Sequence, residues 1–178
     1  MNELDLETVP AASLAEILRP KTLDDVVAQA PLLGPQGWPR SVLLHGSLGS
    51  IICWGPPGTG KTTIAKLLAD AADMAFEPIL AVFDGFGELR KVFDRAAQRR
   101  LQGRRTLLFV DKVQRFNKAQ QHGLLPRVEN GAVTLVGATT ENLSFALNGA
   151  LLSRAQVLLS LLAFGAGYWA VRHSGIWQ

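Results

Sequence analysis

Short apolar runs alternate with longer amphipathic stretches through the middle of the chain. Runs of four to seven residues suit buried strands of a parallel sheet, and they lie at 51–54, 76–82, 106–110, 133–137 and 155–160. Apolar residues at helical spacing predict helices over 61–73, 87–102 and around 118–125. Gly103 is expected to end the second of these helices. Strands that alternate with helices predict an α/β fold with a mainly parallel, five-stranded sheet.

The segments on either side of this alternation differ in composition. Residues 1–18 carry four acids and no base, and residues 19–50 are rich in Pro and Gly. The uncharged run 155–171 reaches the lower limit for a membrane helix. A membrane anchor is one interpretation of it; the simpler one is a fifth strand at 155–160 followed by an atypical or truncated tail. We therefore expect an acidic lead-in at 1–18, a core at 19–158, an apolar tail at 159–178 and no membrane contact.

Composition narrows the class of protein. The chain has 178 residues, of which 48% are hydrophobic and 19% charged, so it is not a disordered, charge-swollen chain. A single cysteine, Cys53, excludes a disulfide scaffold and a four-cysteine zinc site, and it is expected to be a small buried strand residue. The acidic start does not fit a signal peptide, which predicts a cytoplasmic protein.

The basic excess is concentrated in one stretch. The chain has a net charge of +3, and residues 88–129 hold eleven Lys and Arg against four acids. Such a stretch can mark a phosphate-bearing partner, or it can be the solvated surface of a helix and a loop. No aromatic residues interleave with Arg99, Arg100, Arg104 and Arg105, as stacking on single strands would require.

One motif carries specific chemistry. Residues 55–62 read GPPGTGKT, which fits G-x-x-x-x-G-K-[ST], and they stand between an expected strand and an expected helix. Glycines let the backbone fold around an anion, and a helix N-terminus adds a positive dipole end. We expect Lys61 to reach the β- and γ-phosphates of a nucleotide; the alternative is a Gly-rich turn with an exposed lysine. The expected nucleotide-binding residues of this loop are Gly55, Pro56, Pro57, Gly58, Thr59, Gly60, Lys61, Thr62 and Thr63.

A P-loop also needs a carboxylate on a neighbouring strand. Asp111 ends the apolar run LLFVD and is expected to hold Mg²⁺ together with the Thr62 hydroxyl. In many ATPases the next residue is a glutamate that polarises the attacking water, but here it is Lys112. A protonated lysine cannot accept that proton, although it can pair with phosphate. The sequence therefore supports nucleotide binding more firmly than turnover.

Together with these motifs, several longer runs resemble the AAA+ ATPases. More narrowly, they resemble the replication-associated recombination group, relatives of the Mgs and Werner-helicase-interacting proteins. The resemblance extends from about residue 18 to residue 158, and RFNKAQQ, GATTEN and LLSRA are more specific than the P-loop. The runs are LRPKTLDDVV at 18–27, IICWGPPGTGKTT at 51–63, GRRTLLFVDKVQRFNKAQQ at 103–121, VGATTENLSF at 136–145 and ALNGALLSRAQVL at 146–158.

The resemblance implies a three-layer P-loop NTPase fold that binds ATP with Mg²⁺. Arg19 and Pro20 fall where this family lines the adenine site, and Thr140 falls at its sensor-1 position. Arg154 falls at the arginine-finger position, which serves the ATP site of the next subunit. Without the resemblance, Thr140 would be read as a strand-end turn and Arg154 as a surface arginine. The family also implies ring-shaped homo-oligomers, DNA at stalled forks, single-strand-binding protein as a partner and a nucleoid-associated location.

The chain departs from the family pattern at several positions, and these keep two functions open. Ala28, Lys112, Gln114 and Leu143 stand where the family has Gly, Glu, His and Pro. The tail shows no pattern of the family's lid or C-terminal oligomerisation region, so we expect the ATPase core without the lid. One hypothesis is an ATPase module of DNA replication, recombination and repair with impaired hydrolysis. The alternative is a non-enzymatic nucleotide-binding remnant without DNA-remodelling activity; a small-molecule kinase fits Thr140 and Arg154 less well.

Overall fold

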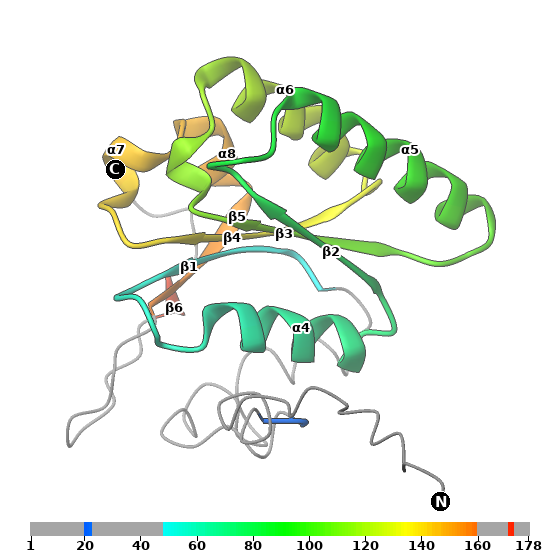
Figure 1. Cartoon of the computed structure of the whole chain (residues 1–178), viewed down its shortest axis with the longest axis horizontal. Helices are drawn as coiled ribbons and strands as arrows, with labels where there is room; N and C mark the ends of the chain where they lie inside the picture. Colours follow the sequence, from blue (N-terminus) through cyan, green and yellow to red (C-terminus); the bar gives the residue numbers. More distant parts are fainter. Residues whose placement is uncertain (1–19, 23–47, 160–170, 173–178) are drawn as a thin grey trace, which may run out of the picture.

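A computed structural model describes residues 20–22, 48–159 and 171–172 (Figure 1). Its centre is a sheet in the order β2-β3-β4-β1-β5-β6. The first five strands of that order are parallel, and β6 pairs antiparallel with β5 at the edge. The strands are β1 (Ser50–Trp54), β2 (Ala75–Leu80), β3 (Thr106–Asp111), β4 (Thr134–Thr139), β5 (Ala155–Leu159) and β6 (Val171–Arg172).

Helices cover both faces of this sheet, which makes three layers (Figure 1). One face packs against α4 (Lys61–Ala71), and the other packs against α5 (Phe86–Leu101), α6 (Lys118–Glu129) and α8 (Gly149–Ser153). Two shorter elements complete the described part, the 3-10 turn η2 (Val113–Arg115) and α7 (Leu143–Ala146). The α/β fold with a mainly parallel sheet expected from the sequence is confirmed; the two-residue β6 is an addition in the region expected to be tail.

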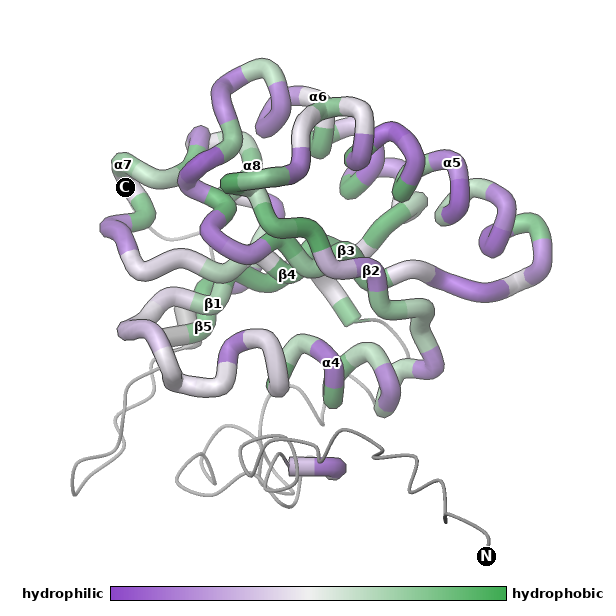
Figure 2. Tube along the Cα trace, viewed as in Figure 1, coloured by the Kyte–Doolittle hydropathy of each residue, from purple (hydrophilic) through white to green (hydrophobic). Residues whose placement is uncertain are grey.

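The core is divided between the two faces because successive strand residues point to opposite sides. On β1, Ile51 and Cys53 join the cluster under α4, whereas Ile52 joins the cluster under α5 and α6. On β3, Leu107 and Phe109 face α4, and Leu108 and Val110 face the other layer. Figure 2 shows the hydrophobic central strands and the many hydrophilic positions along α5. A strand buried on both faces reads as a continuous apolar run, which is why these strands could be recognised in the sequence.

Several element ends differ from the sequence expectation, among them those of β2 and α6. β2 ends at Leu80 rather than at residue 82, because the Leu80 carbonyl accepts from the amides of Phe83 and Asp84 and starts a turn. The Asp84 carboxylate closes that turn by accepting from the Leu80 amide at 2.7 Å. α6 runs on to Glu129 rather than ending near 125. Asn117 and Gln120 form a capping box at its start, and Gly131, with φ 68°, follows its end.

Candidate nucleotide-binding site

The candidate site lies where the central parallel strands end. β1 runs between β4 and β5, and Trp54 pairs with Thr139 at the last position of its register with β4. The Gly55 amide donates to the Thr139 carbonyl at 3.1 Å, so the ladder continues into the P-loop. A pocket of about 610 Å³ opens at this edge. It is lined by Pro20, Pro57, Gly58, Gly60, Lys61, Thr62, Thr63, Asp111, Lys112, Ala138, Thr139 and Thr140.

The P-loop backbone takes the conformation that its glycines were expected to allow. Gly58 and Gly60 have φ values of 79° and 78°, in the left-handed region that side chains with a Cβ disfavour. Gly60 is the N-cap of α4, and its carbonyl accepts from the Ile64 amide at 2.9 Å. The first turn of α4 holds no acidic residue, so its own side chains do not neutralise the positive end of the helix dipole. The loop is therefore shaped and charged to receive an anion.

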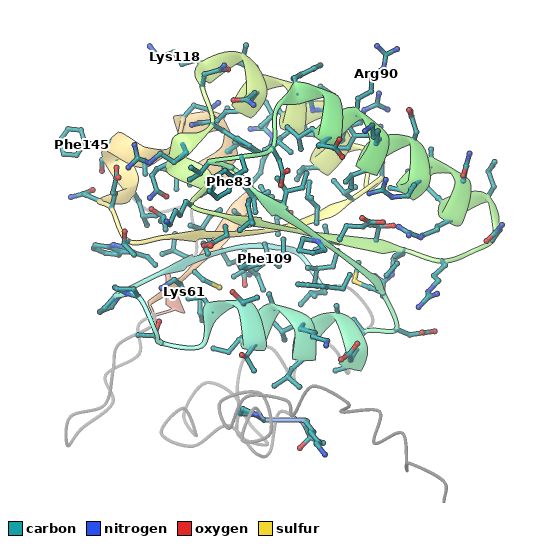
Figure 3. The ribbon with its side chains drawn as sticks, viewed as in Figure 1. Lys61, Phe83, Arg90, Phe109, Lys118 and Phe145 are labelled. Carbon is teal, nitrogen blue, oxygen red and sulfur yellow. The ribbon has the colours of Figure 1, made fainter. Side chains whose placement is uncertain are left out.

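Lys61 is held inside this loop at the start of α4 (Figure 3). Its Nζ donates to the carbonyls of Gly55 at 2.9 Å and Pro56 at 2.6 Å, and to the Thr59 hydroxyl at 3.3 Å. The residue is 9% exposed, and this burial lowers the pKa of its ammonium, against the opposing influence of Cys53 and Asp111. A phosphate oxygen would replace a carbonyl as acceptor, since the ammonium donates three bonds and is already aimed into the loop.

Cys53 lies beneath the loop on β1 and is fully buried, as its sequence context predicted. Burial raises the pKa of its thiol to about 12, and the Lys61 charge acts in the other direction. A thiol with that pKa is neutral near pH 7, so it is a packing residue and not a nucleophile. Among the described residues that line the pocket, the acidic side chain is that of Asp111, and it lines the pocket together with Lys61.

The side chains expected to bind Mg²⁺ lie on the wall of the same pocket. Asp111 is the last residue of β3 and is partly exposed, and Thr62 is in the first turn of α4 and exposed. Mg²⁺ is usually held by one or two carboxylates together with substrate phosphates and waters. The described residues contain no cluster of three or more His, Cys, Asp or Glu. One carboxylate and one hydroxyl beside a phosphate-binding loop thus fit Mg²⁺ that arrives with a nucleotide.

Lys112 has an unusual backbone conformation at the edge of this pocket. Its φ of 54° and ψ of 49° are left-handed, which is uncommon for a residue with a side chain. Its carbonyl accepts from the Arg115 amide at 2.8 Å and so begins η2. The residue is exposed, and no residue in the described part of the chain bonds to its ammonium. Functional sites often hold residues in such sparsely populated conformations.

Of the other expected site residues, some reach this pocket and some do not. Pro20 and Thr140 line it, as do Ala138 and Thr139, which the sequence analysis did not single out. The parallel register of β4 with β1 and β3 brings Ala138 and Thr139 to the pocket, since Ala138 pairs with both Cys53 and Asp111. Arg19 lies outside the described residues.

Arg154 is not among the residues that line the pocket. Its Nε lies 2.5 Å from Glu129 Oε1, and its Nη1 donates to the Ala150 carbonyl at 3.1 Å. The residues that line the pocket also do not include Gly55, Pro56 and Thr59. These three accept hydrogen bonds from the Lys61 ammonium and so hold it in the loop.

Part of the basic stretch is occupied by contacts within the chain. Arg95 and Arg99 bind Glu77, Lys91 binds Glu88, and Arg100 donates to the Asn130 carbonyl. For the four basic residues Lys91, Arg95, Arg99 and Arg100, these contacts favour a solvated protein surface over a binding site for a phosphate-bearing partner. No helix within the described ranges combines the length and apolarity needed to span a membrane.

Residues 51–161 match the family model of the ATPase family associated with various cellular activities, AAA. The chain belongs to the AAA family. This AAA chain is 51% identical over 145 residues to replication-associated recombination protein A of Haemophilus influenzae, and 50% identical over 157 residues to that of Escherichia coli K12. The matches cover 81% and 88% of the chain but only 32% and 35% of these relatives, so the chain spans about a third of their length. The resemblance described from the sequence is confirmed.

Solved structures show the same AAA architecture. The Holliday junction branch migration motor RuvB of Thermotoga maritima superposes with a TM-score of 0.67 at 29% sequence identity. The match covers 83% of this chain and 49% of RuvB. The three-layer P-loop NTPase core expected from the sequence is therefore confirmed.

Proposed function

We propose that this chain is the nucleotide-binding core of an AAA ATPase of the replication-associated recombination type. It binds ATP with Mg²⁺ at the P-loop and hydrolyses it slowly. The observation that carries the proposal is that the P-loop, Asp111, Lys112 and Thr140 line one pocket at the carboxyl ends of parallel strands. Ligands of open α/β sheets bind at this edge.

Each group has a role that its position supports. The amides of residues 58–62 and the N-terminus of α4 bind the phosphates, and Lys61 contributes the nearest positive charge. Thr62 and Asp111 hold Mg²⁺, which supplies charge neutralisation between the phosphates. Pro20, which lines the pocket, and Arg19, which precedes it in the sequence, bind the base. Thr140 follows β4 on the same wall, where its hydroxyl orients the terminal phosphate or water.

Slow hydrolysis follows from Lys112. Removing the group that accepts a proton from the attacking water forfeits about 10²–10⁴-fold in rate. An ammonium has no lone pair with which to accept a proton, so it cannot take that role. Binding therefore remains while turnover is impaired. The competing hypothesis, a remnant that binds nucleotide but has no enzymatic or DNA-remodelling activity, shares this prediction for binding and differs in whether any turnover persists.

Arg154 is proposed to serve the site of a neighbouring subunit. It lies on the surface after α8, and it must release Glu129 to reach another molecule. A finger arginine is worth about 10³–10⁵ in rate in well-characterised phosphoryl-transfer enzymes. This role needs a homo-oligomer. We propose that the longer proteins to which this chain is related form one.

The names of the relatives support a nucleic-acid partner. The relatives are named for replication-associated recombination, and RuvB for migrating Holliday junctions. We therefore propose forked or junction DNA as the macromolecular substrate, single-strand-binding protein as a partner and a nucleoid-associated cytoplasmic location. In this proposal residues 19–158 form the ATPase core, 1–18 a lead-in and 159–178 a tail.

The test is binding of a fluorescent ATP analogue by the purified chain, with hydrolysis followed on the same sample with and without DNA. Lys61→Ala should abolish Mg²⁺-dependent binding, and Lys66→Ala, on the exposed side of α4, should bind as the wild type does. Retained affinity in Lys61→Ala would remove the P-loop assignment. Tight binding with slow turnover supports impaired hydrolysis, and tight Mg²⁺-dependent binding without any turnover supports the non-enzymatic remnant. DNA-stimulated turnover at an ordinary rate contradicts both.

A further inference from the structure

We propose that Lys112 binds the terminal phosphate of the nucleotide, so that the pocket selects nucleoside triphosphates over diphosphates and depends less on Mg²⁺. The inference rests on the proposed nucleotide site. It assigns a ligand contact to Lys112, which the proposed function treats only as the replacement of a proton-accepting glutamate. The backbone position of Lys112 and the charges of the pocket support this contact.

The backbone places Lys112 at the pocket and keeps it there. Asp111, on one side, is fixed by strand pairing with Leu80 and Ala138. Val113, on the other side, is fully buried and packs closely over Gly137 of β4. Between these two anchors, Lys112 takes its left-handed conformation and is one of the residues that line the pocket. The position is therefore fixed by the sheet and not by a mobile loop.

The position within the pocket indicates which phosphate is contacted. The P-loop lies at the β1–α4 side, where its amides would surround the inner phosphates and Lys61 would reach the β- and γ-phosphates. Lys112 directly follows the carboxylate that is proposed to bind Mg²⁺, after β3, which β4 separates from β1 in the sheet. A long cationic side chain there reaches the outermost phosphate, which a diphosphate lacks.

The charge balance of the pocket supports the same conclusion. Among the described lining residues, the charged side chains are Lys61, Lys112 and Asp111, so the wall is net positive. A glutamate at 112 would make it net negative and would require a metal ion to admit the polyphosphate. Within the described part of the chain, no acidic group pairs with the Lys112 ammonium, so a phosphate would not have to displace one. Lysine is a common phosphate ligand as a point charge.

The experiment measures the Kd of ATP and of ADP for the full chain, each in Mg²⁺ and in EDTA. Lys112→Gln should weaken ATP binding about tenfold, as expected for one hydrogen bond to a charged group, and leave ADP binding within about twofold. Lys112→Arg should restore the preference for ATP. In EDTA the loss of ATP affinity should be larger for Lys112→Gln than for the wild type. The matched charge-removal control is Lys66→Gln, which should not change the ratio of the two Kd values.

The outcomes separate this inference from the proposed function. If the wild type binds both nucleotides and Lys112→Gln leaves the ATP-to-ADP ratio unchanged, the terminal-phosphate contact is wrong and the P-loop site stands. Equal weakening of ATP and ADP in that variant also overturns the contact, because it indicates a general effect of charge or folding. If the wild type binds neither nucleotide, the proposed function fails and the inference fails with it.

Discussion

Arg95 on α5 donates two hydrogen bonds to Glu77 on β2, from Nε to Oε1 at 3.0 Å and from Nη2 to Oε2 at 2.7 Å. Arg99, one turn further along the helix, donates a third bond to Oε1 at 2.6 Å. Glu77 is 9% exposed, and the hydrogen bond from Arg95 is the main reason that its pKa lies below the usual value. This fork-to-fork pair fixes α5 against the edge of the sheet.

Replacing Glu77 should therefore destabilise the protein in a pH-dependent way. We expect Glu77→Gln to lower the free energy of unfolding by about 1–3 kcal/mol near neutral pH, because the charge-assisted bonds are lost. The loss stays within this range because Arg95 is half exposed and can bind water instead. A carboxylate whose folded pKa is lowered stabilises above the unfolded pKa, and this contribution disappears as the pH falls through the folded pKa. Urea denaturation at several pH values should show the two proteins converge below the usual glutamate pKa of 4.5.

Glu88→Gln is the matched control for this prediction. Glu88 pairs with Lys91 at 2.6 Å on the exposed face of the same helix. Exposed pairs three residues apart contribute at most about 0.5 kcal/mol, so this variant should unfold almost as the wild type does. An equal loss in both variants would mean that the Glu77 network carries no special stability.

Gln121 should be the most sensitive polar residue of α6. Its buried Nε2 donates to the carbonyls of Phe116 at 3.1 Å and Ala146 at 3.2 Å, and its Oε1 accepts from the Asn148 amide at 2.8 Å. Gln121→Leu would leave three backbone groups without this partner, which should cost about 2–4 kcal/mol in thermal or chemical unfolding. Gln120→Leu, which removes only half of the capping box, should cost less than about 1 kcal/mol. Similar losses in the two variants would refute the role of the buried amide.

Gly137 should tolerate no larger side chain unless a neighbour is shortened. A Cβ at this position would lie 2.9 Å from Ile52 Cδ1 and 3.3 Å from Val113 Cγ1. Gly137→Ala should therefore lower stability by about 1–3 kcal/mol through overpacking. Because Ile52→Val removes the clashing Cδ1, the double variant should be more stable than the sum of the single effects predicts.

The control for overpacking is Gly149→Ala, at the start of α8, where a Cβ meets nothing within 4 Å. This variant should keep or slightly raise the stability, since alanine restricts the unfolded chain. Strict additivity of Gly137→Ala and Ile52→Val would show that the contact with Ile52 is not the source of the cost.

Restoring a carboxylate after Asp111 should raise turnover. Lys112→Glu provides a group that can accept a proton from water, so the ATPase rate at saturating nucleotide should rise by about tenfold or more, provided that assembly is intact. Saturation is needed because the same change is expected to weaken ATP binding. Lys112→Gln removes the positive charge without adding a base, and its rate should stay at the wild-type level. An unchanged rate in Lys112→Glu would mean that another step limits hydrolysis.

The local sequence was enough to predict the five parallel strands, the helices α4, α5 and α6, and the phosphate loop, but not the short elements η2, α7, α8 and β6. Strands buried on both faces must be apolar throughout, and the left-handed turns of the P-loop require glycines such as Gly58 and Gly60. Gly103 ends α5 as expected, with φ 77°. These features depend on backbone conformation and burial within a few residues, so a linear pattern records them.

Only the tertiary structure showed which distant groups meet. Glu77 forms ion pairs with Arg95 and Arg99, and Arg154 forms one with Glu129. Ala138 and Thr139 line the pocket because of the register of β4. Even the end of β2 depends on the Asp84 side chain folding back onto Leu80. Residue types alone indicate that such groups need partners, but the choice of partner is made by strand order and helix placement. That choice has no local signature, because it depends on packing of the whole sheet.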